Sequence, residues 1–485
     1  MSQIQLPKLR RVDPNKPKKK KILLLSDDLR LHSGIATMAR EFVMGTVGEY
    51  DWCQIGAAIN HPEAGQGIDL SSEVTKVTGV EDAYVRIYPN NGYGDPDTLY
   101  RIIDIEKPDA ILHFTDPRFW GWLYQIEHEI RQKMPLMYYN IWDDVPYPMW
   151  NQDFYESCDL LMNISKQTQN IVKNVLIRYP KPDWAVQYVP HGINEKVFRP
   201  LNDADADWEE FGKFKEDFKK QHDAEFVVFW NNRNIRRKQP GDVILAYKEF
   251  CDKLPWDAAG KCVLFMHTQP IDDNGTDLIA VKNMICPDYK IVFSNQAVDP
   301  KVMNFYYNLA DVTVNIASNE GFGLSGAESL MAGTPIINNV TGGLQDHCRF
   351  EDEDGNWINF TSDFPSNHTG RYKQCGTWAK PVFPTNRSLQ GSPATPYIFD
   401  DRCDFVDVAN AIMEWYNTPV EQRKAAGLAA REWVTSDESC MSARKMSDRF
   451  IECMNKCLDS WTPRKRFAIY KPTKQQTIKH TGVLA

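Results

Sequence analysis

Short apolar runs, each bounded by charged or polar residues, recur through the first two hundred positions of the chain. Such runs lie at residues 21–26, 110–114, 136–141 and 160–164. A strand that is buried on both faces of a parallel sheet has this pattern. The stretches 121–133 and 166–176 between them have helical spacing. Strands that alternate with helices predict a parallel α/β sheet covered on both faces.

A second series of the same kind follows a break in the pattern. The break is an acidic, loop-like stretch at residues 202–210, directly after Phe198-Arg199-Pro200. The strands predicted beyond it lie at residues 226–230, 261–266, 290–293, 312–316 and 335–338, and helical spacing returns at residues 405–416, 421–434 and 439–458. Two such halves in succession predict an α/β fold of two Rossmann-like domains that face each other across a cleft. Ligands bind such domains at the carboxyl ends of the strands.

The same pattern predicts the domain organisation. We expect a basic tail at residues 1–20, an N-terminal domain at 21–200, a C-terminal domain at 201–450, and a final segment at 451–485 that returns to the N-terminal domain. Within the second domain, residues 346–401 do not alternate and are rich in Asn, Ser, Pro, Gly and aromatic residues. We expect this stretch to be irregular and functional, because structureless segments of that length are uncommon in compact domains.

The composition is that of an ordinary globular protein, and it bears on the cellular compartment that we expect for the protein. At 485 residues, with 42% hydrophobic and 25% charged positions, two large domains are expected. The 11 cysteines form no Cys-x-x-Cys pair, so neither a structural zinc site nor a disulfide scaffold is indicated. No apolar run approaches the ~20 residues that span a bilayer. We therefore expect a cytoplasmic protein.

Charge is unevenly distributed along the chain. The formal net charge of -9 gives the whole molecule no attraction to nucleic acid or to anionic membranes. Basic residues nevertheless gather at both ends, at Lys18 to Lys21 and again between Arg464 and Lys479. They are interpreted either as solvated tails or as arms that contact a polyanion.

The loop at residues 318–328 carries the clearest chemical signal. It follows a predicted strand and leads into a helix, and it contains Gly321 and Gly323. Glycines at such a junction let backbone N–H groups approach an anion at the helix N-terminus, although a tight structural turn has the same pattern. The carboxylates of Glu320 and Glu328 flank the loop and could accept hydrogen bonds from sugar and ribose hydroxyls.

These residues resemble a known family. The stretch from Glu320 to Glu328 resembles the Glu-x7-Glu motif of retaining GT-B glycosyltransferases. The signals that accompany it are Ala332-Gly333-Thr334-Pro335, Thr341-Gly342-Gly343, Pro190-His191-Gly192-Ile193-Asn194, Phe198-Arg199-Pro200, and the pair Arg233 and Lys238. The resemblance implies the GT-B fold, with a donor-binding cleft between the two domains.

The resemblance also implies roles for individual residues. It makes Arg233 and Lys238 the clamp for the donor diphosphate, Glu328 the ligand of the donor ribose, and Glu320 the ligand of the transferred sugar. Donor contacts are further expected from Gly34, Gly321, Phe322, Gly323, Leu324 and Ser325. A nucleotide diphosphate sugar, most often a UDP-sugar, is then the co-substrate, and the scheme requires neither a bound cofactor nor a metal.

The acceptor side departs from the family pattern. Where many relatives have two histidines, this chain has His113 and Thr115, followed by Asp116, and it has Asp143 and Asp144 where relatives often have His-Asp. Together with Glu320, the three aspartates become the candidate catalytic residues. Their alternative is a role in helix caps and turns.

Several functions fit this reading. The first is a retaining hexosyl- or pentosyltransferase. The basic tails and the aromatic, Arg- and Lys-bearing stretch 346–401 suggest a hydroxymethylated base in DNA as its acceptor. Some viral glycosyltransferases have such an acceptor, which would place the protein in a host cytoplasm. A polysaccharide, a glycoprotein or a small glycan is the alternative acceptor. A non-catalytic nucleotide-sugar-binding protein on the same fold is the second class of hypothesis.

Overall fold

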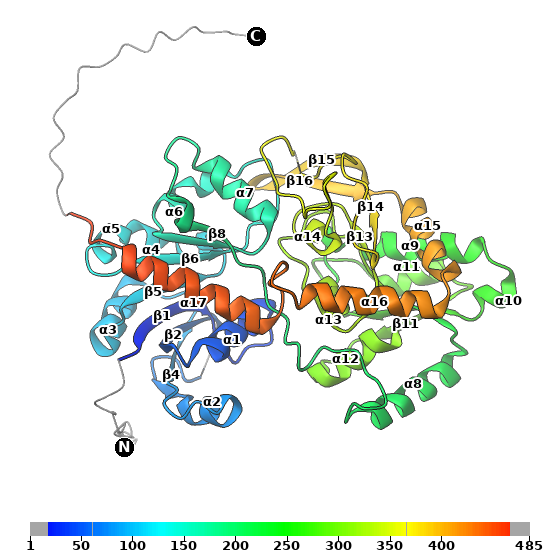
Figure 1. Ribbon diagram of the computed structural model, residues 1–485, viewed down its shortest axis with the longest axis horizontal. Helices are drawn as coiled ribbons and strands as arrows, with labels where there is room; N and C mark the ends of the chain where they lie inside the picture. The colour runs from blue at the N-terminus through cyan, green and yellow to red at the C-terminus, as the bar shows by residue number, and fades with distance from the viewer. Residues whose placement is uncertain (1–17, 61, 365, 466–485) are drawn as a thin grey trace, which may run out of the picture.

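Two α/β domains lie side by side in the computed structural model (Figure 1), which describes residues 18–60, 62–364 and 366–465. The first domain holds an eight-stranded sheet in the order β3-β4-β2-β1-β5-β6-β7-β8, and the second a six-stranded sheet in the order β11-β10-β9-β12-β13-β14. All neighbouring strands are parallel except β3 and β4. The predicted pair of Rossmann-like domains is confirmed.

The described part of the N-terminal domain begins with β1 and ends with β8. Its strands are β1 (Lys20–Asp27), β2 (Tyr50–Ile59), β3 (Ile68–Asp69), β4 (Val85–Asn91), β5 (Ala110–Phe114), β6 (Leu136–Asn140), β7 (Leu160–Asn163) and β8 (Val186–Tyr188). Its helices are α1 (Gly34–Thr46), α2 (Ser71–Thr78), α3 (Pro96–Glu106), α4 (Gly121–Gln125), α5 (Glu127–Ile130), α6 (Gln152–Glu156) and α7 (Lys166–Val175), with 3-10 turns η1 (Pro117–Trp120), η2 (Met149–Asn151) and η3 (Asp183–Ala185). The stretch 121–133, predicted as one helix, is divided between α4 and α5.

The C-terminal domain follows the same plan. Its strands are β9 (Phe226–Asn231), β10 (Cys262–His267), β11 (Lys290–Ser294), β12 (Val312–Asn315), β13 (Ile336–Asn339) and β14 (Ala379–Val382). Its helices are α8 (Trp208–His222), α9 (Pro240–Asp252), α10 (Trp256–Ala259), α11 (Leu278–Ile285), α12 (Pro300–Leu309), α13 (Leu324–Met331), α14 (Leu344–Cys348), α15 (Phe405–Asn417) and α16 (Val420–Val434), with the 3-10 turn η4 (Arg236–Lys238).

Alternate residues of the central strands enter different cores. On β1, Ile22 and Leu24 face one hydrophobic cluster, and Leu23 and Leu25 face another. This is the arrangement that a continuous apolar run predicts, because successive side chains of a strand point to opposite faces of the sheet. The cluster that holds Ile22 continues into the second domain, where it includes Phe322. The two domains therefore share a continuous apolar core.

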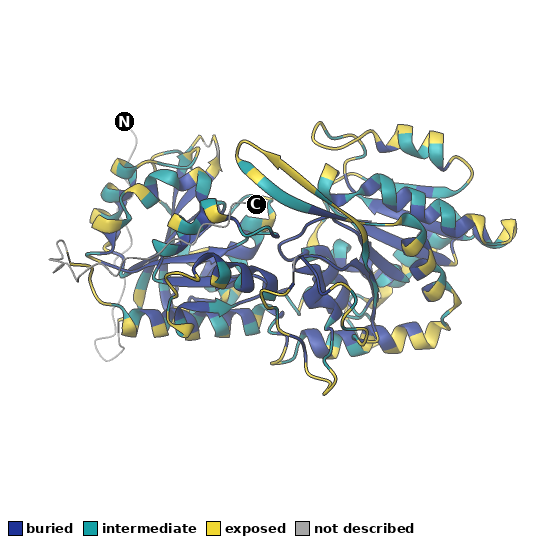
Figure 2. Ribbon diagram, turned by 90° about the horizontal axis from the view of Figure 1, so that it is seen from above, coloured by how far each residue is buried: buried dark blue, intermediate teal, exposed yellow. Residues whose placement is uncertain are grey.

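Residues 346–401 are more ordered than the sequence analysis expected. They contain α14, the sheet strand β14 and a two-stranded antiparallel hairpin, β15 (Pro384–Ser392) and β16 (Thr395–Cys403). The hairpin forms an exposed ribbon that extends between the two domains (Figure 2). Its polar residues conceal the strand pattern, since neither face is uniformly buried.

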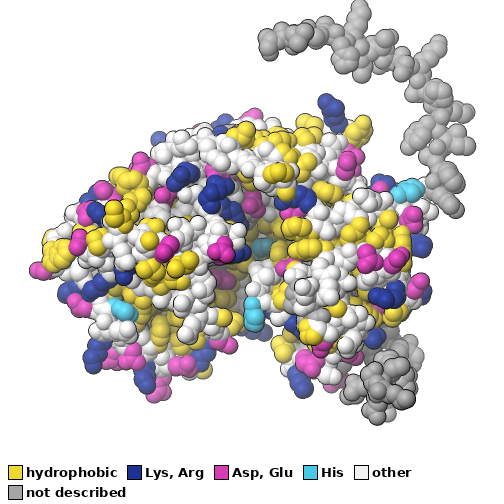
Figure 3. Space-filling view, turned by 180° about the vertical axis from the view of Figure 1, so that it is seen from behind, with side chains coloured by type: hydrophobic (Ala, Val, Ile, Leu, Met, Phe, Trp, Pro, Cys, Tyr) yellow, Lys and Arg dark blue, Asp and Glu magenta, His cyan; other side chains and the backbone are white. Residues whose placement is uncertain are grey.

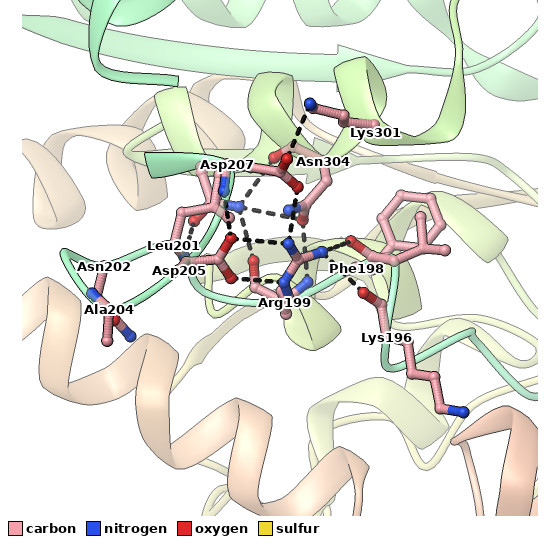
Figure 4. Close-up of polar contacts among 12 residues, drawn as sticks. Lys196, Phe198, Arg199, Leu201, Asn202, Ala204, Asp205, Asp207, Lys301 and Asn304 are labelled. Carbon is pink, nitrogen blue, oxygen red and sulfur yellow. Dashed lines mark hydrogen bonds and ion pairs between the residues drawn. The ribbon is translucent and has the colours of Figure 1, made fainter. Parts of the chain in front are cut away.

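A compact ion-pair cluster fixes the chain where it enters the second domain. Arg199 pairs with Asp205 through Nε and Oδ2 at 2.6 Å and with Asp207 through Nη2 and Oδ2 at 2.8 Å (Figure 4). Its backbone N–H donates to Asn304 on α12 at 3.0 Å, and Lys301 of the same helix pairs with Asp207 at 2.8 Å. The acidic stretch after Pro200 is thus a folded turn that is anchored to α12.

The last helix, α17 (Ala443–Ser460), leaves the second domain and packs on the first (Figure 1). The rings of Phe450 and of Phe42 on α1 are stacked with centroids 4.6 Å apart, and the Tyr50 hydroxyl donates to Asn455 at 2.8 Å. Both phenylalanines are fully buried. This helix therefore ties the end of the chain to the sheet with which the chain begins.

Truncation of Phe450 tests this packing. Phe450→Ala should lower the free energy of unfolding by about 3–5 kcal/mol, because the substitution removes a buried ring and leaves a cavity. The measurement is the urea midpoint, with Lys456→Ala on the exposed side of the same helix as the control. An unchanged midpoint for Phe450→Ala would contradict the proposed contribution of α17.

Candidate functional site

The loop between β12 and α13 begins a helix without a side-chain cap. Gly323 stands at the N-cap position of α13 with φ 90°, and no side-chain hydrogen bond closes that end. A Cβ atom at Gly323 would lie 2.6 Å from Leu344, so both the conformation and the space require glycine. The first-turn N–H groups of an uncapped helix, together with its dipole, attract anions.

The matching glycine of the first domain meets this helix directly. A Cβ atom at Gly34, the first residue of α1, would lie 3.4 Å from the Leu324 side chain, the first residue of α13. Ser33 caps α1 by accepting from Ala36 N–H at 3.0 Å, and its hydroxyl donates to Asp27 at 2.8 Å. The two predicted halves of the donor site, one from each domain, are therefore in contact.

The structure pairs Glu320 with Lys238. The Lys238 ammonium contacts the Glu320 carboxylate, and Arg237 Nη1 lies 3.2 Å from the same oxygen, Glu320 Oε2. Glu320 and Lys238 are each 8% exposed. A buried carboxylate is thus compensated by two cations at the C-terminal side of the cleft. The family resemblance implied that Lys238 binds a diphosphate and that Glu320 binds a sugar. The pairing of the two residues with each other was not predicted.

Glu328 is held by a tyrosine that the sequence analysis missed. The Tyr307 hydroxyl on α12 donates to Glu328 Oε2 at 2.7 Å and accepts from Asn231 at 2.9 Å, where β9 ends. Burial raises the pKa of Glu328 to about 7, and the hydrogen bond from Tyr307 opposes that rise. Tyr307 lies outside the Glu-x7-Glu stretch, and no local motif marks it.

Arg233 occupies a different environment from Lys238. Its side chain is 64% exposed and pairs with Asp272 through Nε and Oδ2 at 2.9 Å. This interaction lowers the pKa of Asp272. Although Arg233 and Lys238 are only five residues apart, the structure gives them separate carboxylate partners. Arg233 therefore stands at the solvent side of the site, and Lys238 at its buried side.

Two loops of the second domain pack closely against the backbone of the first. A Cβ atom at Gly321 would lie 2.9 Å from the Ile141 carbonyl oxygen, and one at Gly342 would lie 3.0 Å from that of Asp143. Phe322 packs edge-on against the His191 ring with centroids 5.1 Å apart. Glycine is needed where two backbones approach this closely. The predicted residues Gly321 and Phe322 are thus parts of a tight seam between the domains.

A cavity of about 340 Å³ opens beside this seam. The view in Figure 3 shows a hollow where the domains meet, with basic and acidic side chains at its rim. The lining residues are Asp116, Pro117, Arg118, Tyr138, Ile141, Trp142, Asp143, Arg236, Arg237, Asn319, Gln390, Gly391, Ser392, Thr395 and Ile398. They come from both domains and from the β15–β16 hairpin. The hairpin contribution was not predicted.

Of the three acceptor-side aspartates, two line this cavity. Asp116 caps η1 and holds Arg118 through both carboxylate oxygens, with Nε at 2.8 and 3.0 Å. Asp143 is half-buried, and no described residue donates a hydrogen bond to its carboxylate. Asp143 is therefore the carboxylate best placed to accept from a ligand hydroxyl.

The third aspartate, Asp144, does not reach the cavity. It is fully buried, and it accepts from Val145 N–H at 2.8 Å and from Gln167 at 3.2 Å. Its Oδ2 lies 3.0 Å from the Thr341 hydroxyl, which lies equally close to Asp401 of the second domain. The prediction of a catalytic role for Asp144 conflicts with this burial, since the carboxyl links the two domains.

The hydrogens of this network can be assigned. A hydroxyl carries one hydrogen, so Thr341 can donate to only one of the two carboxyls, and the other must donate to it. Burial, and then the charge of Asp401, raise the pKa of Asp144 well above its usual value. Asp401 is compensated by Arg387 at 2.9 Å. We therefore expect Asp144 to be the protonated member and to donate to Thr341, which in turn donates to Asp401.

Three of the cations behind the DNA hypothesis have structural partners. In residues 346–401, Lys380 pairs with Glu414 at 2.6 Å, Arg387 with Asp401, and Arg371 lies over the Phe364 ring at 5.5 Å. The tails at residues 1–17 and 466–485 lie outside the described residues. Transfer to DNA stays a prediction that the described residues do not strengthen.

Neither a metal-binding cluster nor a membrane-spanning helix is found in the described part of the chain. Within residues 18–60, 62–364 and 366–465, no cluster of three or more His, Cys, Asp or Glu side chains is arranged to hold a metal ion. In the same part of the chain, no helix has the length and apolarity needed to cross a membrane.

Comparison with known proteins identifies the fold. No family model and no curated protein matches the sequence. Solved structures do match: HepE of Anabaena in complex with UDP and glucose has a TM-score of 0.60 and 12% identity, over 90% of this chain and 100% of that chain. The α,α-trehalose 6-phosphate synthase of Burkholderia multivorans has a TM-score of 0.63 and 10% identity, over 92% and 100%.

A third match is the sucrose-phosphate synthase of Thermosynechococcus elongatus, with a TM-score of 0.60 and 14% identity over 91% of this chain and 100% of that chain. All three similarities extend over both domains. The chain therefore has the GT-B fold, as the resemblance implied.

Substitution of Asp144 tests the assignment of its proton. Asp144→Asn should change the free energy of unfolding by less than about 1 kcal/mol, because an amide supplies the same donor and acceptor. Asp144→Ala should cost about 1–3 kcal/mol, because it leaves buried partners unpaired. Urea unfolding measures both, with exposed Asp153→Ala as the control. Equal losses for Asn and Ala would mean that Asp144 is ionised.

Proposed function

We propose that the protein is a retaining glycosyltransferase that transfers a sugar from a UDP-sugar to a hydroxyl acceptor. The observation that carries the proposal is one assembly: Glu320, Lys238 and Glu328 gather around the uncapped N-terminus of α13, opposite Gly34 of the other domain. Structures of the same fold support the choice of donor, since HepE was crystallised with UDP and with UDP-glucose.

In this proposal the diphosphate lies between the start of α1 and the start of α13. Lys238 and the N–H groups of Leu324 and Ser325 bind it from the buried side, and Arg233 binds it from the solvent side. The diphosphate competes with Glu320 for Lys238. Once released from that ion pair, the Glu320 carboxylate accepts hydrogen bonds from the transferred sugar.

Glu328 is proposed as the ligand of the ribose. An ionised carboxylate accepts two hydrogen bonds from a vicinal diol. Tyr307 and Asn231 fix the carboxylate in place, so little conformational entropy is lost when the ribose binds. This role requires the deprotonated form of a group whose pKa is about 7.

The reaction replaces one bond to the anomeric carbon with another. The bond to the β-phosphate oxygen of UDP breaks, and the acceptor oxygen forms its bond on the face that UDP leaves. The hydroxyl proton passes to the departing phosphate oxygen. Lys238, Arg233 and the α13 dipole stabilise the charge that develops on that phosphate, which is the largest contribution expected in such a site. Asp143 accepts a hydrogen bond from the incoming hydroxyl and orients it.

Hydrolysis of UDP-glucose in the absence of an acceptor tests the proposal. Lys238→Ala should reduce UDP release at least ~100-fold, as expected for the loss of one donor to a transition-state charge. Glu328→Gln should also reduce it strongly, while the exposed Lys248→Ala serves as the control. Full turnover in Lys238→Ala would exclude this site. UDP binding without turnover in the unaltered protein would favour a non-catalytic nucleotide-sugar-binding protein.

Donor affinity should depend on pH through Glu328. Its pKa is raised, so the carboxyl is protonated below about pH 7 and cannot accept from both ribose hydroxyls. With a single such group, the affinity for UDP-glucose should be about tenfold weaker at pH 6 than at pH 8. Isothermal titration calorimetry measures it, and Glu328→Gln should bind weakly and independently of pH. A pH-dependent Glu328→Gln variant would assign the titration to another group.

A further inference from the structure

The β15–β16 hairpin belongs to the second domain but is attached to the first. Phe399 N–H donates to the Val145 carbonyl at 2.9 Å, and the Tyr397 hydroxyl donates to the Tyr147 carbonyl at 3.2 Å. Near the hairpin turn, Arg118 donates to the Thr395 hydroxyl at 2.6 Å. Phe399 also packs against the core of the N-terminal domain. The hairpin therefore reaches from the second domain onto the first. Hydrogen bonds to the first domain hold it both near its turn and further along β16.

This crossing places the hairpin over the 340 Å³ cavity. Gln390, Gly391 and Ser392 at the end of β15 line it, whereas Leu389, directly before them, is 61% exposed and is not part of the lining. Successive side chains of a strand point to opposite faces, so Gln390 faces the cavity and Leu389 faces solvent. Trp142 also lines the cavity, and its indole N–H donates to the Asp144 carbonyl at 2.6 Å. The cavity thus has a rigid aromatic wall and a polar roof.

The arginines around the cavity are already paired with carboxylates. Arg118 is held by Asp116, and Arg237 lies 3.2 Å from Glu320. Arg236 contacts Asp400. A ligand phosphate would have to displace one of these carboxylates, and it would also face Asp143. The donor site adds the uncapped start of α13 to its paired cations, whereas the lining of this cavity includes no residue of α13, and the nearby turn η1 is capped by Asp116. The cavity therefore suits a neutral ligand better than an anionic one.

The remaining polar groups are neutral and suit hydroxyls. Ser392 accepts from Thr395 N–H at 3.2 Å and keeps its own hydrogen to donate. The Gln390 amide donates to Ser388 at 3.1 Å and retains its carbonyl oxygen as an acceptor. A ring with several hydroxyls offers both donors and acceptors to such groups.

We propose that the β15–β16 hairpin roofs the acceptor subsite, and that Gln390 and Ser392 select an uncharged, hydroxyl-bearing ring such as a terminal sugar residue over a phosphorylated one. The proposal rests on the function proposed above in treating the ligand as the acceptor. Asp116 and Asp143 form the floor of this subsite, beside Asn319 and Arg237, through which it adjoins Glu320.

Ligand binding to the full-length protein with UDP tests the selectivity without requiring turnover. Saturation-transfer NMR would compare the methyl α-glycosides of glucose, mannose and galactose with glucose 6-phosphate and mannose 6-phosphate. At least one neutral glycoside should bind ten times more tightly than either phosphate. A duplex that contains 5-hydroxymethylcytosine forms a third arm. Tighter binding of a sugar phosphate, or displacement of the glycoside by the duplex, would overturn the proposal.

Hairpin variants locate the bound glycoside. The double variant Gln390→Ala/Ser392→Ala should weaken glycoside binding about tenfold, while Leu389→Ala on the opposite face should leave it unchanged. The urea midpoint of both variants should match that of the unaltered protein, which shows that they fold. Equal effects of the two variants would overturn the proposal.

The two proposals fail in different ways. If the unaltered protein releases no UDP but binds glycoside in a hairpin-dependent manner, the subsite stands and the transferase function falls. If UDP is released but no neutral glycoside binds, the transferase function stands and the subsite assignment falls.

Discussion

Close contact of main chain with main chain between the two domains is the constraint on which the site depends. Gly321 and Gly342 of the second domain press against the carbonyl groups of Ile141 and Asp143 in the first, with no room for a Cβ atom. This contact sets the distance between the starts of α1 and α13, and hence the geometry of the donor site. A side chain at Gly321 would push the two domains apart, and one at Gly342 would in addition strike the Glu320 carbonyl oxygen of its own domain at 2.2 Å.

A buried polar network reinforces the contact nearby. Asp144 and Asp401 come from opposite domains and are joined through the Thr341 hydroxyl. Two carboxyls can be buried side by side because burial raises the pKa of Asp144, which favours its neutral form, and because Asp401 faces Arg387. The α17 helix and the hairpin add apolar contacts across the same boundary. The seam therefore combines close backbone approach, a satisfied polar network and a continuous core.

Cations at the surface of the cleft are paired with carboxylates. Each cation considered for the donor site has a carboxylate partner: Lys238 and Arg237 have Glu320, and Arg233 has Asp272. In such an arrangement an arriving anion exchanges partners with a carboxylate and does not enter an uncompensated positive site. The exchange would release Glu320 at the place where sugar hydroxyls are expected, which couples diphosphate binding to sugar binding.

Apolar runs and glycine positions predicted much of this protein, since they depend on local physics. A run such as residues 110–114 must be buried on both faces, and the observed β5 has the same bounds. The strands β2 and β4 were missed because charged and polar residues interrupt them, and the hairpin was missed because both of its faces are polar. The carboxylates of the site were found from one short loop that has a recognisable spacing.

Sequence by itself determined the two parallel α/β domains and the loop between β12 and α13, because strand periodicity and helix-capping chemistry act over a few residues. Tertiary structure alone decided which groups meet. Tyr307 reaches Glu328 from another helix, and Asp144 turns into the domain seam while its neighbour Asp143 lines the cavity. Gln390, from a distant hairpin, lines the same cavity as Trp142. These pairings depend on how the whole chain packs, and no local pattern encodes that packing.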